Sequence, residues 1–535
     1  MKMKVNVNKQ NKILLAGLLV CLQVTAFTLY AEEAPEDPGT VAPKRTGQWY
    51  HADPASQPVK LRLNDLTTIV AARAKLQGRL FEGKGLTGQH GVAGFYSPNA
   101  QLTFYVNAPE TDDYALSIIL ATPDVQTMEF KCGNSVITTP SMVKAWEGSP
   151  RNWRQYIPGL LHLKKGVNEI SFRLPESTVK PSNKNTDLAT HREQEQFMLY
   201  SIELGTPAAR QAQLERAKEI RGDSSWMVEG KYGLFIHFSA NMYGWTGNKT
   251  RSEWFQESVN MFDVQHFADQ VERTGAAWVN FTVTHQGFYW PGPSKAVDAV
   301  MPGRTTKRDL LMEIIDELAQ RGIATLFYLH SGYNGVRADE WRAALGANYG
   351  TADVSRFNDN MIAILRECSL RYGKKVKGFG YIDGCLMHDY PLDPHWESWA
   401  RAIKAGNPDA VIGFSSNQGP SVSPFSDLST RDGGAALSEA NPDLMGSGKQ
   451  YSDVDPAWWC FVDTWYPRKP MNGKWTQGPR HPTQAYVDYF KQMAEKGVPV
   501  TINLSMTADV TDDHPIFNPE CMAVMEEVRK VIRGK

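Results

Sequence analysis

Four side chains that could carry out chemistry each stand at the end of a short apolar run of the sequence. These are His237, His285, His330 and Asp383. Imidazole and carboxylate groups act as acids, bases, metal ligands and hydrogen-bonding groups. A single histidine at a strand end most often has a structural role. The chain has only 12 histidines, so three of them with one carboxylate at corresponding positions indicate a shared site.

Two kinds of chemistry fit these four residues. One is metal-assisted hydrolysis, with all four as ligands. Barrel metallohydrolases commonly place two histidines, one residue apart, on one strand, and the run before His237 offers only that one. The other is glycoside hydrolysis, which needs two carboxylates flanking the bond together with neutral donors and aromatic surfaces. The 15 tryptophans and the β-rich region that precedes these residues favour the second, and no metal or other cofactor is expected.

The apolar runs predict a parallel sheet. Asp263 can cap a helix with an apolar face over 264–271, a second helix is predicted over 308–321, and such helices end near a glycine that precedes a buried strand. Repeated helix–glycine–strand units predict a (β/α)8-like, TIM-type barrel over residues 225–535, whose site lies at the carboxyl ends of the strands. An open doubly wound sheet is the alternative, but no glycine-rich phosphate loop follows any strand. The predicted strands are 234–236, 278–283, 323–328, 376–382, 410–414, 459–462 and 500–504.

The first part of the chain has a different period. Apolar and polar residues alternate over 102–107, 114–120 and 170–174, which predicts an antiparallel β-sandwich over residues 45–205. The segments 113–117 and 163–170 resemble those of carbohydrate-binding modules, although a purely structural sandwich fits equally well. Residues 206–224 form a helix-favouring run that we interpret as a connector.

The N-terminus and the composition bear on location and partners. Residues 1–31 read as a signal peptide and 32–44 as a flexible leader, so export to the periplasm or medium is predicted, with no membrane association after cleavage. Lipid anchoring at Cys21 is not favoured, because Val20 stands where a small residue is usual. The 57 basic and 58 acidic side chains give a net charge of −1, which argues against a nucleic-acid partner.

An ordered set of motifs in the second part resembles glycoside hydrolase family 29, the α-L-fucosidases. The resemblance spans roughly residues 228–535. It includes His237 in the first block, the pair Glu253-Trp254, His285 in a Thr-His-Gln-Gly-Phe stretch, and Asp383 in Ile-Asp-Gly. The full set is Lys231–Phe238, Ser252–Phe255, Phe262-Asp263, Phe267-Ala268, Thr274–Ala276, Thr284–Phe288, Trp290-Pro291, Arg308–Leu311, Arg321-Gly322, Ile382–Gly384, Val498–Leu504 and Thr507–Asp509.

The resemblance implies roles for individual residues. Asp383 matches the catalytic nucleophile of a retaining mechanism. His237, Glu253, Trp254, His285 and Tyr381 match positions that line the sugar pocket. Without the family context, Glu253 and Trp254 would read as a surface carboxylate beside a core tryptophan.

The chain departs from the family pattern at three points. Thr284 stands where a second histidine is usual, Tyr381 replaces a tryptophan, and the Trp-Glu pair that often supplies the acid/base is not evident near Trp458. We therefore predict that the acid comes from the loop 417–457, with Glu439 as the first candidate and Asp432 as the second. The other carboxylates of that loop are Asp427, Asp443, Asp453 and Asp455.

Taken together, the sequence predicts an exported retaining exo-glycosidase that releases terminal α-L-fucose, or a related sugar, from an oligosaccharide or polysaccharide. Two alternatives stay open. One is a non-catalytic glycan-binding protein that has kept the pocket and lost the acid/base. The other is a glycosidase of changed sugar specificity, since the departures at Thr284 and Tyr381 fall in the pocket.

Overall fold

The computed structural model describes residues 53–534 except for a series of gaps. The predicted signal peptide and leader, Cys21, Glu439 and Asp432 lie outside the described residues. The gaps are 79, 85–89, 97–98, 123, 142–152, 177–196, 240–248, 286–287, 331–342, 347–354, 384–394, 415–422, 431–436, 438–454, 457, 462–477 and 507–515.

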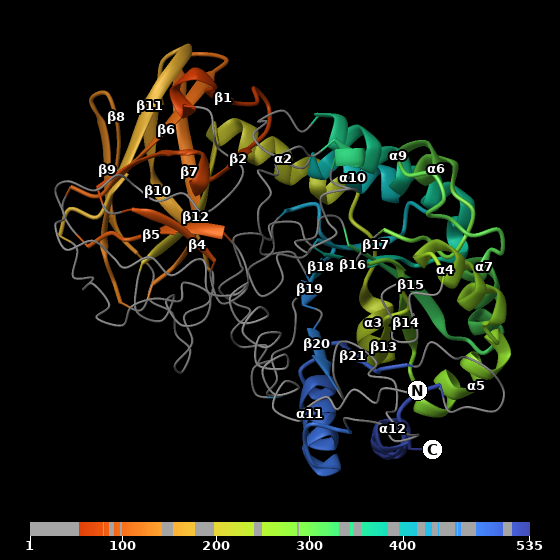
Figure 1. The fold of residues 1–535 in the computed structure, drawn as a ribbon. Coiled ribbons are helices and arrows are strands. Elements are labelled where there is room, and N and C mark those ends of the chain that lie inside the picture. Colours follow the sequence, from red (N-terminus) through yellow and green to blue (C-terminus); the bar gives the residue numbers. More distant parts are fainter. Residues whose placement is uncertain are drawn as a thin grey trace, which may run out of the picture.

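The first part of the chain forms two sheets of six strands each, drawn in red to yellow in Figure 1. One runs in the order β1-β6-β11-β8-β9, with β3 also on β6, and the other in the order β10-β7-β12-β5-β4, with β2 also on β12. All pairings in them are antiparallel except that of β1 with β6. The strands are β1 (Val59–Lys60), β2 (Thr67–Val70), β3 (Lys75–Gln77), β4 (Phe81–Lys84), β5 (His90–Ala93), β6 (Gln101–Ala108), β7 (Asp112–Ala121), β8 (Thr127–Cys132), β9 (Ser135–Pro140), β10 (Trp153–Leu163), β11 (Gly166–Arg173) and β12 (Met198–Gly205), with 3-10 turns at Pro54–Ser56 and Ala71–Arg73.

Both sheets contribute to one buried hydrophobic cluster. Phe104 of β6 and Ile170 of β11 belong to it, as do Leu116 of β7 and Ile202 of β12. The alternation seen in the sequence therefore places the apolar face of each sheet against the other. The predicted strands at 102–107 and 114–120 fall within β6 and β7, and the one at 170–174 overlaps β11, which ends at Arg173.

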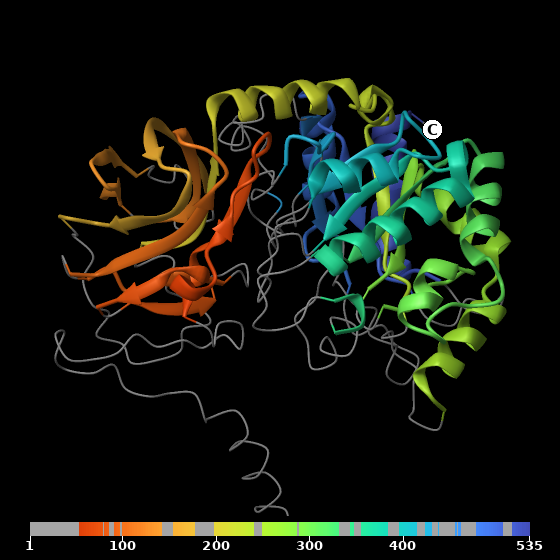
Figure 2. The same cartoon turned by 90° about the horizontal axis from the view of Figure 1, so that it is seen from above.

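A helix links these sheets to the rest of the chain. Helix α2 (Pro207–Glu219) starts at Thr206, whose hydroxyl accepts from the backbone N–H of Ala209 at 3.0 Å, an ordinary N-cap. Arg216 of α2 bridges the two parts, with its guanidinium 2.7 Å from Glu397 and 3.7 Å from Asp65. Figure 2 shows α2 running from the orange sheets to the green and blue part.

The second part contains a seven-stranded, all-parallel sheet in the order β17-β16-β15-β14-β13-β21-β20. Each of the seven strands predicted from the sequence is present in it. The strands are β13 (Tyr232–Ile236), β14 (Trp278–Thr284), β15 (Ala324–His330), β16 (Gly378–Asp383), β17 (Val411–Phe414), β20 (Trp458–Phe461) and β21 (Val500–Asn503), and the short strands β18 (Leu428–Ser429) and β19 (Asp455–Pro456) pair separately.

Helices cover one face of this sheet. Outward side chains of the strands, such as Phe281, Phe327 and Ile382, share a hydrophobic cluster with the apolar faces of the helices. The helices are α3 (Ser225–Gly230), α4 (Arg251–Met261), α5 (Val264–Thr274), α6 (Lys295–Val300), α7 (Leu310–Gln320), α9 (Ser355–Tyr372), α10 (Trp396–Ile403), α11 (Thr483–Glu495) and α12 (Pro519–Arg533), with a 3-10 turn at Gly373–Lys375. Among the described helices, none has the length and apolar content needed to cross a bilayer.

The other face of the sheet is strongly curved. The indole N–H of Trp278 on β14 donates to the hydroxyl of Thr501 on β21 at 3.1 Å, although β13 lies between these strands. A Cβ added to Gly380 on β16 would lie 3.4 Å from the side chain of Asn280 on β14, across β15. Side chains of non-adjacent strands meet in this way only on a concave face, so the sheet encloses its own small core.

Candidate functional site

Four polar side chains gather at one end of the concave face. His237 and His285 directly follow β13 and β14, while His330 and Asp383 are the last residues of β15 and β16. The ring centroids of His237 and His285 lie 5.2 Å apart, and those of His285 and His330 lie 5.5 Å apart. The carboxyl ends of parallel strands meet at one edge, and the structure thus brings together the residues that the strand-end argument singled out.

Asp383 is the only carboxylate in this cluster of four. The hydroxyl of Tyr328 donates to its Oδ2 at 2.8 Å, and Nε2 of His330 lies 3.8 Å from the same oxygen. The side chains of His330 and Asp383 are buried, with 2% and 8% of their surface exposed. A buried carboxylate needs such donors, because an unpaired charge away from water is costly.

Two irregularities in the strands determine which side chains reach the cluster. Trp278 and Asn280 of β14 face the concave side, and simple alternation would bring Thr282 and then Thr284 there. A register shift between Thr282 and Thr284 adds one residue to β14 relative to β15, and His285 joins the cluster instead. Bulges of this kind commonly re-aim side chains beside functional sites.

A second register shift occurs in β16. Phe379 and Ile382 are three positions apart, while their partners on β17, Ile412 and Phe414, are two positions apart. Phe379 and Ile382 both pack into the cluster beneath the helices. Asp383 is therefore left on the concave side, paired in register with His330 of β15.

Burial keeps the two leading histidines neutral. It lowers the pKa of His237 well below its ordinary value, and a charge on the neighbouring His285 would lower it further, while the hydrogen bond from Nδ1 of His237 to Oδ1 of Asn503 opposes this. Burial, followed by repulsion from a charge on His330, likewise lowers the pKa of His285. At neutral pH these imidazoles therefore act as uncharged donors and acceptors.

Tyr381 lies in the same core, two residues before Asp383. Its ring stacks on that of Tyr328 with centroids 5.7 Å apart, and both rings are fully buried. Tyr328 was missed by the reasoning from sequence. It stands two residues before His330 on β15, so period-two alternation from His330 would have placed it on the same face.

Glu253 and Trp254 lie on α4, and the structure gives each a local role. The carboxylate of Glu253 accepts from the backbone N–H and the hydroxyl of Thr250, at 2.8 and 2.7 Å, which closes a capping box and lowers the pKa of Glu253. The side chain of Trp254 is partly buried against the core beneath the helices. A sugar-binding role for this pair stays a prediction.

Of the loop carboxylates considered as acids, Asp427 is held in structural contacts. It is 2% exposed and forms an ion pair with Lys404 at 2.9 Å. It also accepts from the backbone N–H groups of Gly222 and Ile412, at 2.8 and 2.9 Å. Asp427 therefore attaches the end of the connector to β17, and both of its carboxylate oxygens are engaged in these contacts. The assignment to Glu439 is outside the described residues.

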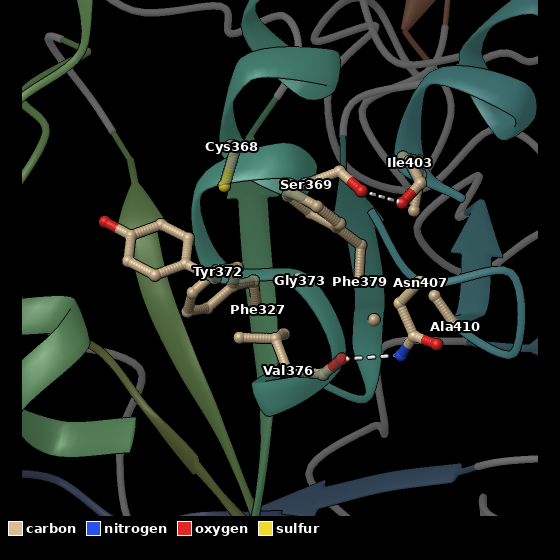
Figure 3. Close-up of a pocket in the computed structure, with 11 residues that line it drawn as sticks. Phe327, Cys368, Ser369, Tyr372, Gly373, Val376, Phe379, Ile403, Asn407 and Ala410 are labelled. Carbon is tan, nitrogen blue, oxygen red and sulfur yellow. Dashed lines mark hydrogen bonds between the residues drawn. The ribbon is translucent and has the colours of Figure 1, made fainter. Parts of the chain in front are cut away.

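Two further observations bear on the kind of site. In the part of the chain that the structure describes, no group of three or more His, Cys, Asp or Glu side chains is arranged to hold a metal ion. Figure 3 shows a separate cavity, between α9, β16 and the residues after α10, beside Cys368 and Asn407. Its volume of about 10 Å³ leaves room for about one water molecule, which excludes a sugar.

Comparisons with known proteins give only distant likenesses. No protein-family model and no curated protein matches the chain. A solved α-L-fucosidase of glycoside hydrolase family 29 from Bacteroides thetaiotaomicron superposes with 18% identity and a TM-score of 0.41, over 58% of this chain and 75% of that one. An α-L-fucosidase from Lactobacillus casei, in complex with its α-L-fucose product, superposes with 10% identity and a TM-score of 0.38. The match covers 58% of this chain and 98% of that one. These values are too low to transfer an activity.

Proposed function

We propose that this protein is a retaining exo-glycosidase that removes terminal α-L-fucose, or a closely related sugar, from glycans. The observation that carries the proposal is the buried carboxylate of Asp383, held by Tyr328 at the carboxyl edge of a parallel sheet among three histidines. A neutral sugar suits a pocket of uncharged imidazoles and phenols around one negative charge. The motif resemblance described above supports fucose.

The fold proposed with this function has two units. The seven parallel strands and their helices form an irregular (β/α)8-like barrel over residues 225–535, supported by the contacts across the concave face. Residues 45–205 form the β-sandwich, supported by the cluster shared between its two sheets. Export by a signal peptide over residues 1–31 completes the proposal.

The reaction proceeds by double displacement. Asp383 attacks the anomeric carbon, while Tyr328 and His330 approach its Oδ2. The glycosidic C–O bond breaks as a second carboxylic acid, for which Glu439 is proposed, gives its proton to the leaving oxygen. That carboxylate then takes a proton from water, and the oxygen of this water displaces Asp383 from the sugar.

Neutral histidines suit this reaction. An uncharged imidazole can accept from one sugar hydroxyl or donate to another without competing for the proton of the acid. Such contacts accelerate the reaction to the extent that they strengthen as the oxocarbenium-like transition state forms. The buried state of His237 and His285 keeps them in this form.

The experiment is hydrolysis of an aryl α-L-fucoside by the wild type and by Asp383→Asn, which has nearly the same shape and no charge. We expect turnover by the wild type and a loss of roughly 10⁴–10⁶-fold in the variant, as for other catalytic nucleophiles. The product's anomeric configuration, followed by NMR, is expected to be retained.

Three outcomes would contradict the proposal. Fucose binding without turnover would indicate a glycan-binding protein. Turnover of a different aryl glycoside would indicate changed specificity. Equal activity of Asp383→Asn would remove Asp383 from the chemistry.

A further inference from the structure

Asn503 is the last residue of β21 and is 1% exposed. Its backbone pairs in register with Phe235 of β13, two residues before His237. Phe235 and His237 are on the same face of the chain, and their rings meet edge to face with centroids 4.0 Å apart. The side chain of Asn503 therefore reaches His237 from the neighbouring strand.

The contact between the two side chains defines the imidazole. Oδ1 of Asn503 lies 2.9 Å from Nδ1 of His237, and an amide oxygen can only accept a hydrogen bond. Nδ1 must then carry the proton, and Nε2 is the acceptor nitrogen of the neutral ring. This tautomer is the reverse of the one that isolated imidazole side chains favour in water, so it needs a partner to hold it.

We propose that Asn503 is a positioning residue that locks His237 in the Nδ1–H tautomer, so that Nε2 accepts a hydrogen bond from a hydroxyl of the sugar. The inference rests on the proposed glycosidase function. Asn503 determines whether Nε2 of His237 accepts a hydrogen bond from the sugar or donates one. It thereby influences which arrangement of sugar hydroxyl groups the pocket selects.

The surroundings of His237 determine what a charge at position 503 would do. Among the residues that the structure describes, the titratable groups facing its ring are His285 from the end of β14 and Tyr328 from β15, with centroids at 5.2 and 5.6 Å. Asp383 accepts from the hydroxyl of Tyr328. Asn503→Asp keeps the shape and the acceptor atom but adds a negative charge beside Nδ1. Such a charge favours the protonated imidazolium, in which Nε2 can only donate.

The first measurement is the pH profile of kcat/KM for aryl fucoside hydrolysis. In Asn503→Asp we expect the acidic limb to move upward by about one to three pH units. In Asn503→Leu, which cannot accept a hydrogen bond, we expect kcat/KM to fall roughly tenfold, the worth of one ordinary hydrogen bond.

Asn358→Asp is the matched control, because Asn358 of α9 is also buried and its Oδ1 also accepts, from Trp399 and the backbone of His395. Its profile is expected to match that of the wild type.

The second measurement is independent of activity. A two-bond ¹H–¹⁵N correlation spectrum of histidine-labelled protein distinguishes the two tautomers, and His237→Gln assigns the signal. We expect the Nδ1–H form in the wild type and its loss in Asn503→Leu. The Nε2–H form in the wild type, or a wild-type pH profile in a folded Asn503→Asp, would overturn the proposal. A wild type without glycosidase activity would instead remove the proposed function, while the spectrum still decides whether Asn503 holds His237.

Discussion

The hydroxyl of Tyr328 donates to Oδ2 of Asp383 at 2.8 Å, from the strand next to the one that carries the carboxylate. The two rings of Tyr328 and Tyr381 stack behind this contact, so the phenol has little freedom to turn away. The carboxylate is consequently held in one orientation, as the proposed role of Asp383 as nucleophile requires.

Tyr328→Phe tests this orientation. The variant keeps the stacked ring and removes the donor, so we expect kcat to fall about 10- to 100-fold, as for one hydrogen bond to a charged group, with little change in KM. Steady-state kinetics on the aryl fucoside give both constants. Tyr372→Phe is the matched control, because the hydroxyl of Tyr372 on α9 also donates to a carboxylate, that of Asp309 at 2.9 Å, outside the strand-end cluster; its kcat is expected to match that of the wild type. An unchanged kcat in Tyr328→Phe would mean that the hydrogen bond does not serve the reaction.

The buried histidines make stability depend on pH. The pKa of His285 in the folded protein lies below that of the unfolded chain, about 6.5, so the unfolded chain binds the proton first as the pH falls. The contribution of neutral His285 to the free energy of unfolding is fully present above about pH 6.5. As the pH falls below this value, the contribution is lost at up to about 1.4 kcal/mol per pH unit. We expect urea unfolding from pH 7.5 to 5.5 to show a steeper loss for the wild type than for His285→Gln. Parallel losses would contradict the assignment.

The ion pair between Lys404 and Asp427 is expected to dominate the attachment of the connector. Burial lowers the pKa of Lys404 and raises that of Asp427, while each partner's charge opposes the change. Lys404→Met leaves a buried carboxylate unpaired and should lower the free energy of unfolding by about 3–5 kcal/mol. Adding Asp427→Asn should restore part of it. Lys375→Met, which breaks an exposed pair with Asp316, should cost about 0–1 kcal/mol. Denaturant unfolding measures the free energy of unfolding of these three variants. Equal losses in Lys404→Met and Lys375→Met would show that burial of the ion pair does not cause the larger loss expected for Lys404→Met.

Variants of Glu253 and Thr250 distinguish a structural role of Glu253 from a role in sugar binding. Either Glu253→Ala or Thr250→Ala breaks the capping box, so both should lower the melting temperature by similar amounts. If Glu253 also holds a sugar hydroxyl, only its replacement should raise KM, by about tenfold. Equal KM values in the two variants would leave Glu253 as a cap alone.

The sequence was sufficient for most of the parallel strands because five of the seven are short apolar runs that follow a helix ending near a glycine, as at Gly322, and precede a polar residue such as His330. Burial on both faces requires that pattern, and little else in the chain produces it. The strand-end rule then placed His237, His285, His330 and Asp383 at a common edge, and the structure brings them together.

Contacts that depend on register could not be predicted in the same way. Nothing in the residue types of β14 shows that one residue is inserted before His285, since the bulge arises from pairing with β15. Asn503 likewise becomes relevant only once β21 lies beside β13. Asp427 looked equivalent to its neighbours in the loop because the sequence does not show that Lys404 is buried beside it.

The extra residue in β16 has a consequence for the direction of the carboxylate. Removal of a single amino acid between Phe379 and Ile382 would restore regular pairing with β17 and would still leave Ile382 beneath the helices and Asp383 on the concave side. Regular pairing of the unchanged sequence would instead turn Ile382 to the concave side and Asp383 toward the helices. The direction in which the carboxylate at position 383 points is thus set by the residue count earlier in its own strand, which a comparison of the residue types at the site would not reveal.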